Sequence, residues 1–364
     1  MENKKLKIDW VNSSFLILVP ILTIIFVVWH LATHRFYPFH FLTFLVFYFA
    51  AGLSITAGYH RLFSHRTYVA NPILEFLFLF FGAGAFQNSA LKWCSDHRIH
   101  HTHADSGRDP YNIGRGFWYA HIGWILLDEK DLQLTSYPKD LEMARMVSWQ
   151  HRYYFPLALF SGLILPGIFC ALFFADFWGG VLWGGLLRIV FVHHATFFIN
   201  SLSHLWGSRP YSEKESARDN YFLTLITYGE GYHNFHHVFP SDYRNGVKWY
   251  HFDPTKWLIY LSSLIGLAKS LKWTSEKEIW KARLGTQYRL VKKQGIPLSI
   301  DRRLIELREK IELKLAQIQS WKKELKERRS EKANEWAEEV KLKLLTAQEE
   351  LQNYISQWEN YLSF

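Results

Sequence analysis

Cysteine is scarce in this chain, which has only Cys94 and Cys170 among its 364 residues. Two cysteines cannot form the disulfide framework of a small secreted domain, and their separation does not match a zinc-binding motif. We therefore expect both to be small buried residues. We also expect no cleavable signal peptide, because the first apolar run is long, lacks a small-residue cleavage pattern and is soon followed by a second run.

Apolar and aromatic residues are abundant, at 49% and 18% of the chain. These fractions are high for a soluble protein, but a mean hydropathy of -0.10 means that the apolar residues are concentrated in a few segments. We therefore expect an integral membrane protein. The net charge of +9 fits polar regions that lie against an anionic cytoplasmic leaflet, or a basic linker and tail without a specific partner. We expect no nucleic-acid partner.

Four apolar segments each have about the 20 residues that a helix needs to cross a bilayer. They pair into two hairpins, with a short turn near Arg35 and Pro38 in the first and Asp176 at the turn of the second. Arg188 lies inside the fourth segment, where it should face protein or a wet cavity rather than lipid. The predicted spans are residues 13–33, 39–59, 155–175 and 177–199.

The charges around the first span predict its orientation. Lys4, Lys5 and Lys7 precede it, whereas the following turn offers only Arg35, so the amino terminus should stay in the cytoplasm. Two hairpins then return every polar segment, and both termini, to the cytoplasmic side.

The remaining membrane-domain segments would form an all-α, cytoplasmic helical cap from residues 60–154 and 200–275. The stretch 73–90 is apolar, but Glu75 and a glycine-rich break weaken it as a span, so we interpret it as an interfacial or re-entrant helix. The shorter apolar run 256–270 should lie on the surface.

The last part of the chain differs in character. Residues 1–275 would form the membrane domain and 276–299 a linker, and from Ile300 apolar residues recur at spacings of three and four among many charged residues. The two apolar stripes do not share a register, so we expect a break near Ser330 and an antiparallel helical hairpin or coiled coil over 300–364. It would pack on its own chain, or on a second subunit in a homodimer. The stripes are Leu304, Leu307, Ile311, Ile318, Trp321 and Leu325, with Lys314 interrupting, and Ala337, Val340, Leu344, Ala347, Leu351, Tyr354, Trp358 and Tyr361.

Half of the 18 histidines form three clusters and one single residue beside the apolar segments. In the second cluster the spacing i, i+3, i+4 places the side chains on one face of a helix, and the third cluster repeats that spacing. Since the clusters follow span two, precede span three and follow span four, they all emerge on one side of the membrane. These residues are His60, His65, His97, His100, His101, His204, His233, His236 and His237.

So many imidazoles exceed what one metal takes, and the pattern therefore indicates two metals with open coordination positions. Nitrogen ligands favour iron, zinc or copper over magnesium or manganese. The remaining histidines show no such repetition. His193 and His194 are adjacent within the fourth span, and we interpret them as residues that support the ligands or pack.

The motifs around these histidines resemble those of the membrane fatty acid desaturases of the stearoyl-CoA, or delta-9, type. The resemblance covers roughly residues 10–270. It implies a non-haem di-iron centre that activates dioxygen and removes two hydrogens from adjacent methylenes of a long acyl chain, leaving a cis double bond. The matching segments are TAGYHRL at 56–62 with His65, DHRIHH at 96–101 followed by THAD and by Asp109 and Pro110, NSLSH at 200–204, and GEGYHNFHH at 229–237.

The resemblance also divides the ligands between the two irons. Each histidine triplet contributes to both irons, which would fix their separation, and Asn200 would hold a water near the second iron. The first iron would take His60, His65, His97, His101 and His236, and the second His100, His204, His233 and His237.

The substrate contacts are implied in the same way. Asn12, Asn88 and Asp96 match positions that hold the head group of an acyl-CoA. Tyr48 and Gly52 stand at the chain-end position on the second span, where Gly52 would leave room for a long acyl tail.

Four positions depart from the family pattern at the head group. Ser95 stands in place of an arginine, Asp128 and Glu129 in place of an Arg-Lys pair, and Phe197 in place of a tryptophan. Because a reversed charge disfavours contact with phosphate, an acyl-carrier-protein thioester or an acyl chain in a membrane lipid stays open beside acyl-CoA.

Neither cysteine nor histidine follows His251, so we expect no fused cytochrome b5 or ferredoxin-like segment. Electrons would come from a separate ferredoxin, rubredoxin or cytochrome b5 with its reductase.

Two rival functions use the same residues. A di-iron lipid or alkane hydroxylase would insert oxygen instead of removing a second hydrogen. A non-enzymatic metal carrier would need polar ligands across the bilayer, for which the spans offer only His193, His194 and Arg188.

Overall fold

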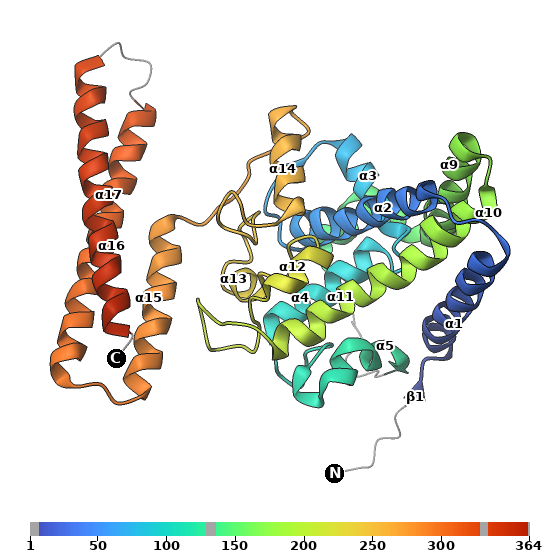
Figure 1. Cartoon of the computed structure of the whole chain (residues 1–364), viewed down its shortest axis with the longest axis horizontal. Helices are drawn as coiled ribbons and strands as arrows, with labels where there is room; N and C mark the ends of the chain where they lie inside the picture. Colours follow the sequence, from blue (N-terminus) through green and yellow to red (C-terminus); the bar gives the residue numbers. More distant parts are fainter. Residues whose placement is uncertain (1–6, 129–135, 328–333, 363–364) are drawn as a thin grey trace. The chain divides into compact units, whose positions relative to one another are not determined.

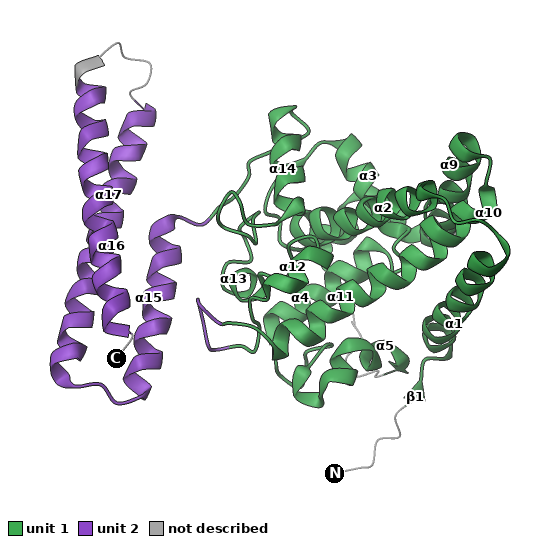
Figure 2. Ribbon diagram, in the orientation of Figure 1, with its two compact units in different colours: residues 1–208, 215–273 green, residues 209–214, 274–364 purple. Residues whose placement is uncertain are grey.

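The computed structural model describes residues 7–128, 136–327 and 334–362, and it contains two compact units (Figures 1 and 2). The first unit comprises Met1–Ser208 and Glu215–Trp273. The second comprises Arg209–Lys214 and Thr274–Phe364.

Four helical segments of the first unit are long and apolar enough to cross a membrane, which confirms the four predicted spans. The second and fourth continue past their predicted ends, because there the helices enter protein and carry histidines instead of facing lipid. The segments are Trp10–Thr33, Pro38–Ser64, Tyr154–Phe174 and Phe177–Leu205.

Three of the spans are built from several helical pieces in succession. Asp9 begins the first by accepting the backbone N–H of Asn12, and Asp176 begins the fourth by accepting that of Gly179. In the second, third and fourth spans, a π-helical stretch follows or separates the α-helical pieces. Such distortions are common near functional sites. In chain order the pieces are α1 (Trp10–Thr33); α2 (Pro38–Leu53) and η1 (Ser54–Ser64); α8 (Tyr154–Leu159), η5 (Phe160–Ile164) and α9 (Leu165–Phe174); and α10 (Phe177–Gly179), η6 (Gly180–Leu187) and α11 (Arg188–Leu205).

Arg188 faces protein, as the sequence predicts for a charge inside a span. Its side chain is 1% exposed, and its guanidinium donates to the carbonyl oxygens of Gly84 at 2.5 Å, Gly162 at 2.7 Å and Gly184 at 3.1 Å. These bonds hold the fourth span against two neighbouring segments. A buried cation without such acceptors would be strongly unfavourable.

The rest of the first unit consists of short helices and two antiparallel strand pairs. The apolar helix α3 is shorter than a span, and α14 exposes Tyr260, Leu261 and Leu264. The helices are α3 (Pro72–Ala83), α4 (Ala90–His103), η2 (Ile113–Arg115), η3 (Tyr119–Gly123), α5 (Trp124–Leu126), α6 (Lys139–Met143), α7 (Arg145–Arg152), α12 (Tyr221–Ile226), α13 (His233–Val238) and α14 (Pro254–Leu264), and the strand pairs are β1 (Lys7–Ile8) with β3 (Leu127–Asp128) and β2 (Val69–Ala70) with β4 (Ala268–Lys269).

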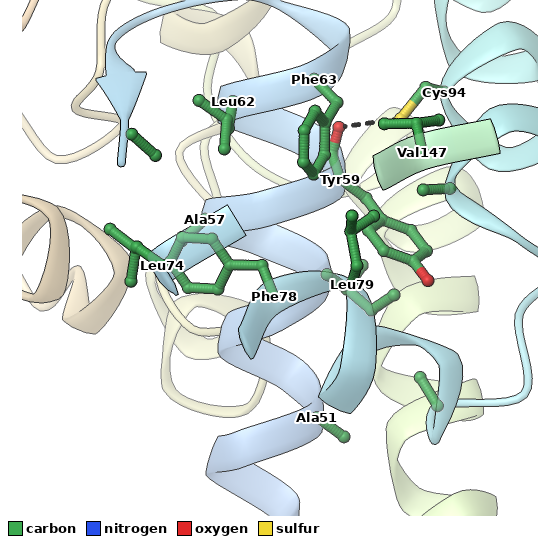
Figure 3. Packing of buried hydrophobic residues seen from close by; sticks show 14 of the residues in the cluster. Ala51, Ala57, Tyr59, Leu62, Phe63, Leu74, Phe78, Leu79, Cys94 and Val147 are labelled. Carbon is green, nitrogen blue, oxygen red and sulfur yellow. Dashed lines mark hydrogen bonds between the residues drawn. The ribbon is translucent and has the colours of Figure 1, made fainter. Parts of the chain in front are cut away.

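The core of this unit lies where η1, α3, α4 and α7 meet (Figure 3). Tyr59, Leu79 and Cys94 are fully buried there. The Cys94 thiol donates to the carbonyl of Tyr59 at 3.2 Å, and Cys170 is buried as a free thiol too, as predicted for both cysteines. This packing fixes η1 against α4, the two helices that carry the first two histidine clusters.

The described part of the second unit contains three helices, where the sequence predicts a linker followed by a hairpin. The linker prediction over 276–299 is wrong for its first part, because α15 (Glu276–Lys293) begins there with Ser275 and Glu278 capping its amino terminus. The other helices are α16 (Leu298–Glu327) and α17 (Asn334–Leu362).

The helices α16 and α17 run antiparallel. Arg303 bonds to Gln357, and Lys314 forms an ion pair with Glu350, so positions later in α16 meet positions earlier in α17. Their apolar stripes pack on each other and on α15 of the same chain. The predicted break at Ser330 lies outside the described residues. The buried residues of the cluster in which the three helices meet are Leu284, Leu304, Leu307, Ile311, Leu315 and Trp358.

Candidate metal centre

Four elements bring the nine predicted ligands together at one end of the spans. η1 carries His60, and His65 follows directly after it. The remaining ligands lie on α4, near the end of α11, and on α13, whose first turn donates two backbone N–H groups to Asp219. The sequence spacing therefore predicted the helical faces of α4 and α13 well.

The nine histidines form two groups, and within each group the ligand nitrogens lie within 4.8 Å of one another. α4 gives two residues to the larger group and one to the smaller, whereas α13 does the reverse. This is the same division that the family resemblance implies. The larger group is His60, His65, His97, His101 and His236, and the smaller is His100, His204, His233 and His237.

The imidazoles of each group point their Nε2 atoms toward one another. In the larger group, the Nε2 atom of His236 is 2.9 Å from that of His60 and 3.0 Å from that of His101. In the smaller group, His233 Nε2 is 3.0 Å from His204 Nε2 and 3.1 Å from His237 Nε2. With a metal-nitrogen distance of about 2.1 Å, neighbouring ligands of an octahedral metal lie about 3 Å apart. The spacing therefore fits two metal ions.

Several of the histidine ligands are oriented by carboxylates that are hydrogen-bonded to Nδ1, the ring nitrogen that does not face the metal position. The Nδ1 atom of His60 lies 3.0 Å from Glu230, that of His100 2.8 Å from Asp109, and that of His237 2.7 Å from Glu215. Such partners hold metal-bound imidazoles in place and raise their basicity.

These partners also determine where the ring protons lie. A carboxylate can only accept a hydrogen bond, so Nδ1 of both His100 and His237 carries the proton and both Nε2 atoms present lone pairs. Yet these two Nε2 atoms are 3.3 Å apart. Two facing lone pairs repel each other unless a cation lies between them, so the donor set fits a metal.

Five of the ligands outside the spans are kept neutral. Burial, and then repulsion from neighbouring imidazoles, lowers the pKa of His97, His101, His233, His236 and His237 well below the usual value. Neutral imidazole is the form that binds a metal.

A buried ionic network supports the larger group. Arg61, which is 1% exposed, bonds to Glu230 at 2.8 Å and to both carboxylate oxygens of Asp253. Desolvation raises the pKa of Glu230, but the charges and hydrogen bonds of His60 and Arg61 outweigh it and hold that pKa at about 2. The carboxylate is therefore ionised and locks the ring of His60.

A third group, of His30, His40 and Asp176, lies at the other end of the spans, and the contact between His40 and Asp176 is a hydrogen bond that needs no metal. His40 Nδ1 accepts the backbone N–H of Tyr37 at 3.2 Å, so the ring proton lies on Nε2 and is donated to Asp176 at 2.8 Å. This bond joins the turns of the two hairpins. His193 and His194 belong to none of the groups, and His193 bonds to the carbonyl of Ala85.

Two cavities adjoin the metal groups and share Trp93, His97, Thr196 and Asn200 among their lining residues. The larger has a volume of about 500 Å³ and is lined in part by β3 and the start of α1. The smaller, of about 40 Å³, continues from the histidines to Gly52 on α2. Because they share these lining residues, the two cavities adjoin each other beside the metal groups.

Tyr228 fills the space beside Gly52, which contradicts the expectation that Gly52 leaves room for a long tail. A Cβ atom at position 52 would lie 1.9 Å from Cζ of Tyr228. The Tyr228 hydroxyl donates to the carbonyl of Tyr48 at 2.9 Å, and the Tyr48 hydroxyl donates to the carbonyl of Ile226 at 2.5 Å. The smaller cavity therefore ends at Tyr228.

The larger cavity contains the predicted head-group residues Asn12, Asn88 and Asp96. Lys92 lies there too, and it forms an ion pair with Asp96 at 2.6 Å. Among the described lining residues Lys92 is the only lysine or arginine.

The positions that depart from the family pattern lie in different surroundings. Asp128 and Phe197 line the larger cavity, whereas Ser95 is buried and bonds to the carbonyl of Leu91 at 2.6 Å. Glu129 lies outside the described residues.

Sequence reasoning missed the residues that position the ligands. Asp109 and Glu230 stand inside the quoted motifs, and an acidic residue beside a histidine cluster is a signal that could have found them. Glu215, Lys92 and Tyr228 lie outside those motifs, and only the folded chain brings them to the site.

Known proteins carry the same pattern. Residues 37–260 match the family model described as fatty acid desaturase. The chain belongs to the fatty acid desaturase family. This membership confirms the resemblance found in the sequence, and with the four apolar helices it makes the chain a multi-pass membrane protein.

Relatives in this family include fungal and cyanobacterial proteins. A probable acyl-CoA desaturase of Schizosaccharomyces pombe is 45% identical over 70% of this chain and 54% of its own length. Acyl-CoA desaturase 1 of Saccharomyces cerevisiae is 40% identical, over 81% of this chain and 58% of its own. An sn-1 stearoyl-lipid 9-desaturase of Anabaena variabilis is 30% identical, over 75% of this chain and 97% of its own. The chain thus spans little more than half the length of the two fungal desaturases.

Proposed function

We propose that this protein is an oxygen-dependent desaturase that introduces a cis double bond, at the delta-9 position, into a long saturated acyl chain. The observation that carries the proposal is the pair of histidine groups beside two adjoining cavities, the smaller of which is lined by Tyr228. A carbon–hydrogen bond in a methylene chain has no acidic proton for a side-chain base. Two irons bound by these groups, together with dioxygen, would supply the oxidant that the chemistry needs.

The reaction balances with an external reductant. One dioxygen, two electrons and two protons convert a –CH2–CH2– unit into –CH=CH– and two waters. The electrons would come from a separate ferredoxin, rubredoxin or cytochrome b5 with its reductase.

The residues of the chain would bind and orient the substrate. The acyl chain would enter from the larger cavity, pass Trp93 and Asn200, and stop against Tyr228, so that one carbon pair lies beside the histidines. Fixing the reacting carbons in this way accounts for a large part of catalysis. Asn200, which lines both cavities, could hold a water beside the smaller histidine group.

The carrier of the acyl chain is proposed from the relatives and from the charges of the cavity. The fungal relatives are named acyl-CoA desaturases, which favours a coenzyme A thioester. The described lining residues, however, include Asp9, Asp96 and Asp128 against the single cation Lys92, and carboxylates disfavour contact with phosphates. An acyl chain in a membrane lipid is therefore a second candidate, as is an acyl-carrier-protein thioester.

We further propose that the histidine end of the spans and both termini lie in the cytoplasm. The lysines before the first span support this orientation. A homodimer through the C-terminal helices is a further proposal, which sedimentation of the purified protein would test.

The test uses the purified protein in detergent with dioxygen and a reduced donor. Stearoyl-CoA, stearoyl-acyl-carrier protein and a stearoyl phospholipid are offered separately, and the products are analysed by mass spectrometry. We expect a monounsaturated C18 chain from at least one carrier. Hydroxylated chains instead would support the rival hydroxylase, and conversion of none of the three would contradict the proposal.

A further inference from the structure

The segment Arg209–Lys214 belongs to the same compact unit as the three C-terminal helices (Figure 2). Within that unit, α15 holds the segment at two points. The Thr286 hydroxyl, which is fully buried, donates to the carbonyl of Tyr211 at 2.7 Å, and Lys293 forms an ion pair with Glu213 at 3.2 Å. The ion pair is partly exposed and contributes little to the stability of this contact, whereas the buried hydrogen bond contributes more.

The next two residues along the chain hold two ligands of the smaller histidine group. Glu215 lies 2.7 Å from Nδ1 of His237, and the Ser216 hydroxyl lies 2.7 Å from Nδ1 of His204. Ser216 also donates to Asp105 through its hydroxyl at 2.5 Å and through its backbone N–H at 2.7 Å. Its hydroxyl oxygen therefore accepts from His204, whose Nε2 is left free for a metal.

We propose that Thr286 is a positioning residue for the four-histidine group, acting through the segment that holds Tyr211 and continues along the chain into Glu215 and Ser216. Fixing the carbonyl of Tyr211 restricts the backbone four residues before Glu215, and so restricts where Glu215 and Ser216 present their oxygen atoms. The five-histidine group has a different support, since His60 is held by Glu230. Loss of the Thr286 hydrogen bond therefore weakens one metal site and spares the other.

The inference rests on the proposed function, because it assumes that both groups bind iron. It assigns a role to a part of the chain that carries none of the histidine ligands. A purely structural role for Thr286 makes a different prediction, namely that its loss destabilises the C-terminal unit and leaves both metal sites unchanged.

The test compares Thr286→Val with Thr286→Ser in the full-length protein. Valine keeps the shape of the side chain and removes the hydroxyl, whereas serine keeps the hydroxyl. Thr346→Val, at an exposed position of α17, makes the same chemical change elsewhere in the unit and serves as the matched control. Iron per chain is measured by mass spectrometry during titration with a chelator, and hydrogen exchange of the Ser216 amide is measured in parallel.

We expect the wild type, Thr286→Ser and Thr346→Val to hold two irons per chain. In Thr286→Val the affinity for one iron should fall about tenfold. This is the lower end of the range expected when a direct hydrogen-bond partner of a metal ligand is removed. Its Ser216 amide should exchange faster. Glu215→Gln removes such a partner itself and sets the scale, with an expected loss of about 10-fold to 100-fold in affinity for the same iron.

Three results would overturn the inference. Thr286→Val could hold both irons as tightly as the wild type, could lose both equally, or could leave exchange of the Ser216 amide unchanged. A wild-type chain that binds no iron would contradict the proposed function itself, and with it this inference.

Discussion

Replacing Tyr228 with alanine should lengthen the acyl chain that the protein prefers. The ring closes the smaller cavity beside Gly52 and is 4% exposed. Tyr228 has a φ of 58°, a left-handed conformation that already strains tyrosine, so alanine adds no further backbone strain there. The substitution therefore removes the end of the smaller cavity without bending the chain that forms it.

The size of the effect follows from burial of the added carbons. Each buried methylene contributes about 0.8 kcal/mol, so two further methylenes contribute about 1.6 kcal/mol. That free energy corresponds to roughly a 15-fold change in relative kcat/KM for a chain two carbons longer. The preference for C20 over C18 substrates should rise by about this factor.

The assay is a competition between C16, C18 and C20 substrates, with products quantified by mass spectrometry. Tyr228→Phe is the matched control, because it keeps the ring and removes only the hydrogen bond to the carbonyl of Tyr48. This variant should keep the wild-type preference for acyl-chain length and lose about 1 kcal/mol of folding stability. Gly52→Ala should shift the preference toward C16, since a Cβ there displaces the Tyr228 ring into the smaller cavity.

An active Tyr228→Ala protein with the wild-type order of C16, C18 and C20 would refute the assignment of Tyr228 as the end of the smaller cavity. The same conclusion would follow if Tyr228→Phe alone produced the full shift, because the ring would then be irrelevant.

Three further predictions concern the metal groups and their supports. His237→Ala should abolish product and lower bound iron, whereas His103→Ala, outside both groups, should change neither; full activity of His237→Ala would defeat the ligand assignment. The pKa of Glu230 in the folded protein is about 2, below its ordinary value of 4.5, so the contribution of Glu230 to stability is present above about pH 4.5 and is lost as the pH falls toward 2. Thermal melts should therefore show a smaller pH dependence for Glu230→Gln over that window, and equal slopes would contradict the role of the network. Arg188→Met should lower the thermal stability in detergent by about 1–3 kcal/mol, because buried carbonyls lose their donor, and an unchanged melting temperature would speak against these bonds.

Much of this fold could be predicted from local patterns. The spans follow from hydrophobic runs of the right length, and the faces of α4 and α13 follow from the spacing of their histidines. Helix α15 was also visible in principle, since Ser275 and Glu278 form the capping pattern that begins it. The prediction of a linker over residues 276–299 did not use this pattern.

The residues that could not be predicted act over long distances in the sequence. Tyr228 meets Gly52 only after the chain folds, and no local pattern marks a tyrosine as the end of a cavity. Glu215 lies outside the histidine motifs for the same reason. Their roles depend on which loop folds over which helix, and spacing within one segment carries no such information.

The central claim is that the two histidine groups carry out acyl desaturation. The most direct measurement is the fatty acid profile of a host that lacks its own desaturase and expresses either this chain or its His100→Ala variant. We expect new cis-monounsaturated chains with the wild type and none with the variant. Hydroxylated chains, or the same monounsaturated product from both, would contradict the claim.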